Sequence, residues 1–348
     1  MRGDSLELIR ADLAQATGGG LERLQPLRGG RLLVTGGTGF VGAWLAEAVA
    51  WLNDAHGFGL RALLMARDTD AFALSAPHLA GRPELSLVRG DVRDVRDLPP
   101  DITWIVHAGA TPDNRVHNTD PLRASETIVG GTRALLAAAA RQPTLDGFLN
   151  VSSGLVYGPQ PLDLDRVPED VFHGSDPSAF GAVYTESKRM AETLCTAYAN
   201  QHRIRVVNAR PFAFIGPYQH LDRPWAINSF LRDGMHGGPI RILGDGETVR
   251  SYMYAADMAA WMLTILAAGQ SGESYNVGSP EGITLRAAAE LVADQSRPRP
   301  RIATSLSSAR QPGRTRFVPD TSRAGGLGLE LRFDLTAAIR RTVQWNAP

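Results

Sequence analysis

The sequence predicts an α/β fold, a doubly wound parallel sheet with a smaller C-terminal lobe, from three observations. Short apolar runs alternate with helix-compatible segments, the first run leads through a glycine-rich turn into a helix, and the alternation loosens beyond about Pro211. Regular alternation of strands and helices favours right-handed crossovers and helices on both faces of a parallel sheet. The chain of 348 residues is long enough for about two domains.

The expected strands are short and apolar, and they cover residues 31–35, 60–65, 85–88, 104–107, 148–151 and 206–209. Helices are expected at 43–52, 134–140 and 255–268. The last of these contains Asp257 and is shorter than the ~20 residues that cross a bilayer. It therefore predicts a buried helix.

Composition excludes several classes of protein. The 36 basic residues balance 36 acidic ones, so no global field favours nucleic acid or an anionic membrane as a partner. The single cysteine, Cys195, excludes an internal disulfide and argues against a cysteine metal cage, and we expect no metal site. The first residues include Asp4 and Glu7 and lack the apolar core of a secretory signal. We expect a cytoplasmic protein.

A glycine loop follows the first predicted strand. Gly36, Gly39 and Gly42 have the spacing G-x-x-G-x-x-G, with Phe40 and Val41 between the last two. Glycines permit a tight turn and close approach of the backbone to a diphosphate, and the helix N-terminus adds free N–H groups. A glycine turn without a ligand is the alternative. The strand-turn-helix context favours a Rossmann-type dinucleotide site.

The end of the second strand bears on the choice of cofactor. An acid there accepts from the ribose 2′-hydroxyl of NAD, whereas an arginine pairs with the 2′-phosphate of NADP. Ala66 occupies the place of the acid and Arg67 follows it, which favours NADP. NAD stays the alternative, because Asp68 is able to reach the ribose. The alternative role for Arg67 is that of a solvated loop residue.

Tyr184 and Lys188 lie four residues apart in a helical stretch, so both side chains project from one face. Bringing a tyrosine pKa from about 10 towards 7 needs roughly 4 kcal/mol of preferential phenolate stabilisation, which a nearby ammonium and a cationic nicotinamide supply in large part. Ser153, at the end of the fifth strand, faces the crevice where parallel sheets bind ligands. A surface pair on a helix is the alternative for the tyrosine and lysine.

Further motifs extend this pattern along the chain. They are Gly90–Arg93 (GDVR), His107–Ala110 (HAGA), Val151–Gly158 (VSSGLVYG), Ala209–Phe212 (ARPF) and Gly244–Gly246 followed by Arg250. Together with the glycine loop and Tyr184 to Lys188, they resemble the extended short-chain dehydrogenase/reductases of the NAD-dependent epimerase/dehydratase group. The resemblance spans about residues 31 to 341.

The resemblance implies roles for particular residues. Asp91 and Val92 would flank the adenine, Ala108 and Gly109 would line the cofactor, and Lys188 would also hold the nicotinamide ribose. The alternative for Asp91 is a turn acid. A homodimer is also implied.

In the remaining segments, Arg250 would grip the diphosphate of a nucleotide sugar and Arg316 would make a second phosphate contact, since an arginine fork matches phosphate oxygens. A solvated arginine is the alternative for each. We assign residues 29–212, with 251–278 returning, to the dinucleotide-binding domain. The substrate-binding lobe then comprises 213–250 and 279–348.

Departures from the group narrow the chemistry. Sugar 4,6-dehydratases of the group carry an acidic pair after the catalytic hydroxyl residue, and the decarboxylases carry a glutamate close behind it, where this chain has Gly154 and Leu155. Ala213 and Ile128 replace asparagines that are common in the group.

These features predict an NAD(P)-dependent nucleotide-sugar 4-epimerase that acts through a transient 4-keto sugar. An NADPH-dependent ketoreductase of a 4-keto sugar is the near alternative. A non-catalytic dinucleotide-binding regulator is the alternative of a different class, because fold alone does not establish chemistry.

Overall fold

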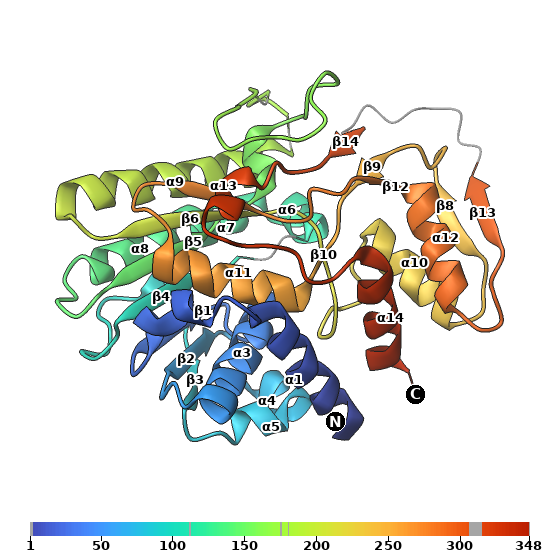
Figure 1. Cartoon of the computed structure of the whole chain (residues 1–348). Helices are drawn as coiled ribbons and strands as arrows, with labels where there is room; N and C mark the ends of the chain where they lie inside the picture. The colour runs from blue at the N-terminus through green and yellow to red at the C-terminus, as the bar shows by residue number, and fades with distance from the viewer. Residues whose placement is uncertain (1–2, 111–112, 175, 180, 306–314, 348) are drawn as a thin grey trace.

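A computed structural model describes residues 3–110, 113–174, 176–179, 181–305 and 315–347. Its centre is a seven-stranded sheet with the strand order β11-β6-β5-β4-β1-β2-β3, in which every neighbouring pair is parallel (Figure 1). This confirms the predicted fold class. The strands are β1 (Arg31–Thr35), β2 (Arg61–Ala66), β3 (Leu85–Arg89), β4 (Trp104–His107), β5 (Gly147–Val151), β6 (Val206–Pro211) and β11 (Ser274–Val277).

Successive side chains of a strand point to opposite faces of the sheet. Both faces carry apolar side chains here, and helices cover both of them. In β1, Leu32 and Val34 join the apolar core on one face, and Leu33 joins the core on the other. The first core contains α3 (Phe40–His56) and α11 (Ala255–Ala268), and the second contains α8 (Gly131–Ala139) and α9 (Ala182–His202). Within the described ranges no helix has the length and apolar character to span a membrane. α11 is instead buried from Ala255 to Leu266.

A smaller group of elements lies at the C-terminal side of the sheet, on the right of Figure 1. It contains α10 (Ala226–Met235), α12 (Leu285–Gln295) and α14 (Leu335–Asn346), with β8 (Ile240–Leu243) paired to β13 (Ile302–Ser305). A three-stranded sheet joins β12 (Ile283–Thr284), β9 (Val249–Arg250) and β14 (Arg316–Phe317). The chain returns to the main sheet through α11 and β11. The division into a cofactor domain and a substrate lobe stays a prediction.

Short elements connect these units. The helices are α2 (Leu21–Leu24), α4 (Asp70–Ser75), α5 (Pro77–Ala80), α6 (Asn114–Thr119), α7 (Pro121–Ser125) and α13 (Ser322–Gly326), and the strands are β7 (Phe214–Ile215) and β10 (Met253–Tyr254). Single turns of 3-10 helix cover Gln25–Leu27, Val92–Asp94 and Gly154–Tyr157, and a π-helical turn covers Glu126–Gly130.

The helix α1 (Gly3–Thr17) precedes the first strand and is not among the helices expected from the sequence. Ile9 and Leu13, one turn apart, are fully buried against the core that contains α3 and α11. Between them, the carboxylate of Asp12 accepts hydrogen bonds from the Tyr254 hydroxyl at 2.5 Å and from Nε of Arg341 at 2.6 Å. α1 is therefore part of the folded core.

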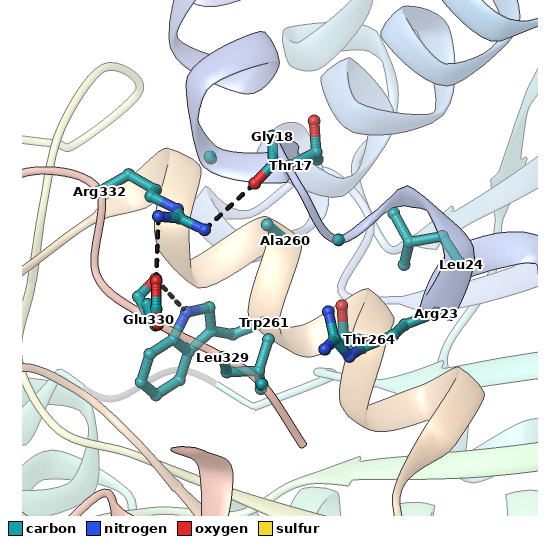
Figure 2. A pocket seen from close by; sticks show the side chains of 13 residues that line it. Thr17, Gly18, Arg23, Leu24, Ala260, Trp261, Thr264, Leu329, Glu330 and Arg332 are labelled. Carbon is teal, nitrogen blue, oxygen red and sulfur yellow. Dashed lines mark hydrogen bonds and ion pairs between the residues drawn. The ribbon is translucent and has the colours of Figure 1, made fainter. Parts of the chain in front are cut away.

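Figure 2 shows the small crevice at the end of α1. Arg332 donates to the carbonyl oxygen of Gly18 at 3.2 Å, and Nε1 of Trp261 in α11 donates to the carbonyl oxygen of Glu330 at 3.2 Å. These bonds join the N-terminal segment, α11 and the segment that leads into α14.

Candidate active site

The glycine loop lies between β1 and α3, as its spacing predicts. Gly36 has φ +68°, and a Cβ on it would lie 2.4 Å from the carbonyl oxygen of Ala108. A Cβ on Gly42 would lie 2.3 Å from the carbonyl oxygen of Gly37. Only glycine allows this closure of the loop against the end of β4, and it brings Ala108 and Gly109 beside the loop.

The first turn of α3 fits a dinucleotide diphosphate. Gly39 is its N-cap, so no side chain caps the turn and its N–H groups are available to an anion. Phe40 and Val41 are half-buried in this turn, and the Phe40 ring stacks on Phe214 with centroids 6.3 Å apart. The residues present therefore fit the diphosphate of a dinucleotide, whether NAD or NADP.

Asp91 and Val92 follow β3 at the same edge of the sheet. The Asp91 carboxylate accepts two hydrogen bonds from the Arg93 guanidinium, at 3.0 and 2.8 Å, and one from the Arg93 backbone N–H at 3.0 Å. The hydrogen bonds from Arg93 hold the pKa of Asp91 low, at about 2. Val92 is buried in the core on the α8 side. Asp91 is thus an ionised acid in the turn after β3, and its contact with the adenine stays a prediction.

Arg67 and Asp68 follow β2. Oδ1 of Asp68 accepts the backbone N–H groups of Asp70 and Ala71, at 3.1 and 3.3 Å, and so begins α4. Arg67 is exposed, and its charge contributes to the lowered pKa of Asp91. Asp68 is also exposed, although its Oδ1 is engaged by the backbone.

Ser153, Tyr184 and Lys188 meet at the carboxyl end of β5. Ser153 is the N-cap of the turn that follows this strand, and its Oγ accepts the N–H of Leu155 at 3.1 Å. Tyr184 and Lys188 project from the first two turns of α9, and Nζ of Lys188 donates to the carbonyl oxygen of Val151 at 2.7 Å. All three side chains are buried. The spacing and the strand end together were enough to predict this convergence.

Burial sets the protonation states of these groups. It raises the pKa of Tyr184 to about 12, against the opposing effect of a hydrogen bond with Ser153. Burial also lowers the pKa of Lys188 to about 8, against the opposing charge of Glu192. Without its cofactor the chain therefore holds Tyr184 as a neutral phenol. Any use of Tyr184 as a base at neutral pH depends on the positive charge that the oxidised nicotinamide brings.

The structure does not bring the two candidate phosphate-binding arginines together. In the parallel pair of β9 and β14, Arg250 lies opposite Phe317 and Val249 opposite Arg316. Residues directly opposite each other share a face of a sheet, and successive residues alternate between faces. Arg250 therefore projects from the Phe317 face and Arg316 from the other.

The surroundings of the two arginines differ accordingly. The Phe317 ring reaches within 2.9 Å of the place a Cβ of Gly154 would occupy, so the Arg250 face is the one beside Ser153. Burial lowers the pKa of Arg250. Arg316 lies 3.6 Å from Asp165 and lines a separate cleft of about 480 Å³. Arg250 thus lies on the face of β9 that is nearer to Ser153, and the phosphate role of each arginine stays a prediction.

Comparison with known proteins decides the family. The profile of the NAD dependent epimerase/dehydratase family matches residues 32–278. The chain belongs to this family. UDP-glucuronic acid decarboxylase 1 of Danio rerio is 27% identical over 316 residues, which are 90% of this chain and 72% of that protein. The low-salt glycan biosynthesis protein Agl12 of Haloferax volcanii is 32% identical over 253 residues, 71% of this chain and 76% of that protein.

Solved structures of this epimerase/dehydratase family share the fold. The UDP-glucuronic acid 4-epimerase of Bacillus cereus, solved with UDP-glucuronic acid and NAD, superposes with a TM-score of 0.77 at 22% identity, over 90% of this chain and 98% of that one. The dTDP-glucose 4,6-dehydratase DesIV of Streptomyces venezuelae, solved with NAD, superposes with a TM-score of 0.75 at 25% identity, over 90% and 96%. The family resemblance seen in the sequence is confirmed.

Tyr184 packs against apolar side chains. Leu155 and Ile128 pack with Tyr184 and Ala191 in one cluster. A Cβ on Gly154 would lie within 2.9 Å of the rings of Phe212 and Phe317, so an acidic side chain has no space at that position. The first two positions after Ser153 thus supply no carboxylate to the site.

Tyr184 also makes a ring contact that the sequence does not predict. The imidazole of His117, in α6, stacks on the ring of Tyr184 with centroids 4.2 Å apart and an interplanar angle of 16°. Both side chains are buried. The two residues are far apart in sequence, and no local pattern around His117 indicates the contact.

Proposed function

We propose that the chain is an NAD(P)-dependent nucleotide-sugar 4-epimerase. The observation that carries the proposal is the convergence of Ser153, Tyr184 and Lys188 at the carboxyl end of β5, where the two residues that follow Ser153 are Gly154 and Leu155 and not acids. Dehydration or decarboxylation would call on an acid at the positions of Gly154 and Leu155. Relatives of known name that act on UDP- and dTDP-sugars support the substrate class.

In this reaction the phenolic oxygen of Tyr184 takes the proton from the sugar 4-hydroxyl, while the Ser153 hydroxyl hydrogen-bonds the same oxygen. The bound dinucleotide supplies a reversible hydride acceptor and donor for C4 of the sugar. Lys188 stabilises the phenolate and would hold the nicotinamide ribose. After the 4-keto sugar has rotated in the site, hydride returns to the other face of C4 and Tyr184 returns the proton to O4. Neither water nor a second reactant is consumed.

The glycine loop, with Ala108 and Gly109 beside it, would hold the dinucleotide, and Arg250 would hold the diphosphate of the substrate. For the cofactor we propose NADP over NAD, because Arg67 is exposed at the end of β2 whereas Asp68 is engaged in starting α4. Relatives solved with NAD make NAD the competing choice. NADP would be supported if the native chain binds the 2′-phosphate and Arg67→Ala loses that binding.

A reductase of 4-keto sugars is the second candidate, and the exposed Arg67 favours it to the extent that reductases draw on NADPH. Incubation with UDP-, dTDP-, CDP- and GDP-sugars in both their 4-hydroxy and 4-keto forms, with oxidised or reduced cofactor supplied, separates the two. The epimerase converts one sugar to its 4-epimer with no net change in absorbance at about 340 nm and keeps a deuterium label at C4. Net loss of reduced cofactor equal to product would exclude the epimerase. No turnover of any of these sugars would exclude both.

A further inference from the structure

The catalytic tyrosine is covered on one ring face by a side chain from outside α9. His117 lies on α6, in the segment that follows β4, and its ring is nearly parallel to that of Tyr184 at a centroid distance of 4.2 Å. Leu155 and Ile128 pack with Tyr184 in a common apolar cluster. The phenol is therefore confined by packing, and its hydroxyl is directed to the hydrogen bond with Ser153.

α6 is in turn anchored at the residue that precedes it. Oδ1 of Asp113 accepts the backbone N–H of Arg115 at 2.9 Å, and Oδ2 accepts from the Arg115 guanidinium at 2.8 Å. Arg223 donates to Oδ2 of Asp113 at 2.6 Å. The Asp113 side chain is only 3% exposed, whereas Arg115 and Arg223 are partly exposed, and the hydrogen bonds from Arg115 and then Arg223 hold the pKa of Asp113 well below its usual range.

The origin of Arg223 gives this anchor its meaning. Arg223 lies between β7 and α10, in the part of the chain that leads into the smaller C-terminal group of elements. A continuous set of contacts therefore runs from that segment through Arg223 and Asp113 to α6, and from His117 to the ring of Tyr184.

We propose that His117 is a positioning residue for Tyr184 and that the Asp113–Arg223 ion pair sets the place of α6. The orientation of the phenol then depends on how the segment that carries Arg223 is seated. The proposal rests on the proposed function, in which Tyr184 exchanges the substrate proton. Displacement of a reacting group by ~1 Å costs about a hundredfold in rate, so a loose tyrosine ring would lower kcat more than it changes substrate binding.

Steady-state kinetics with the nucleotide sugar that the native chain turns over tests this. His117→Ala should lower kcat about tenfold to a hundredfold and change KM about twofold or less. His117→Phe keeps a flat ring against Tyr184 and should stay within about threefold of the native kcat. His202→Ala is the matched control, because it removes an imidazole stacked on Tyr198 of the same helix, with centroids 5.2 Å apart. An unchanged kcat in His117→Ala, or equal losses in the Ala and Phe variants, would overturn the proposal.

A spectroscopic readout keeps this test separate from the proposed function. In full-length protein with 13C-labelled tyrosine rings, the Tyr184 signals are those lost in Tyr184→Phe. His117→Ala should shift these signals, and Arg223→Met should shift them in the same sense through Asp113. If the Tyr184 signals shift in both variants but the native chain turns over no nucleotide sugar, the proposed function is refuted and the positioning role is not. Turnover by the native chain with Tyr184 signals that neither variant moves would sink the positioning role alone.

Discussion

The substitution Tyr184→Phe removes one hydroxyl from the site and leaves the ring and its packing in place. In the cofactor-free chain, burial raises the pKa of Tyr184 to about 12. At about pH 8 this leaves only about one phenolate in 10⁴ molecules, and lowering the pKa to 8 needs about 5 kcal/mol of differential stabilisation. Lys188 is already present in the chain whose Tyr184 pKa is about 12, so this stabilisation would have to come from the charge of the oxidised nicotinamide. Proton transfer by a positioned side chain contributes about 10² to 10⁴ in rate, and we expect kcat to fall by that factor.

Two assays test this reasoning. The first compares kcat of Tyr184→Phe with that of Tyr198→Phe, a half-buried tyrosine of the same helix that stacks on His202 and should leave kcat unchanged. The second follows tyrosine ionisation by ultraviolet difference spectroscopy between the native chain and Tyr184→Phe. The Tyr184 phenol should titrate near 12 without cofactor and several units lower with oxidised cofactor. An active Tyr184→Phe variant, or a titration that the cofactor does not move, would refute the assignment.

Three further predictions concern the loop, the stability and the cofactor. Gly36→Ala should weaken dinucleotide binding at least about tenfold, because its Cβ would lie 2.4 Å from the carbonyl oxygen of Ala108. Gly29 is the control, because its φ of +71° is similar and a Cβ on it would have no atom within 4 Å. Gly29→Ala should cost about 1–3 kcal/mol of stability and leave dinucleotide binding intact. Burial raises the pKa of Asp257 from 3.8 to about 7, so its contribution to stability is full below pH 3.8 and is lost as the pH rises through 7. Urea unfolding from pH 5 to 7 should therefore show a loss of about 2 kcal/mol that Asp257→Asn abolishes, and an equal loss in both chains would contradict it. Arg67→Ala should raise KM for NADP about tenfold and leave KM for NAD within about twofold, and equal changes for both would exclude a 2′-phosphate contact.

Much of the sheet could be predicted from the sequence because its signals are local. Apolar runs at 31–35, 104–107 and 148–151 become β1, β4 and β5 within one residue. The glycine loop and the four-residue spacing of Tyr184 and Lys188 are also local signals, because each involves residues within about one or two turns of chain. The strand end at Ser153 then brings the two motifs to one edge of the sheet.

The parts that could not be predicted depend on distant contacts. The helix α1 is not among the helices expected from the sequence, although Ile9 and Leu13 have the spacing of a helix face, because its burial depends on contacts with α3 and α11. The stack of His117 on Tyr184 depends on how the segment after β4 folds back over α9. The opposite faces of Arg250 and Arg316 follow from the register of β9 and β14, which a sequence cannot supply for strands of two residues.

The docking of α1 has a consequence for how the chain reaches its final form. Asp12 and Arg341 are 329 positions apart, and Asp12 also bonds Tyr254. Closing so long a loop is entropically costly, and contacts of such separation slow folding. The seat of α1 is complete only after α11 and α14 have folded onto the sheet. Until that step, Ile9 and Leu13 remain open to water and to other chains, so aggregation during refolding should be most sensitive to residues of α1.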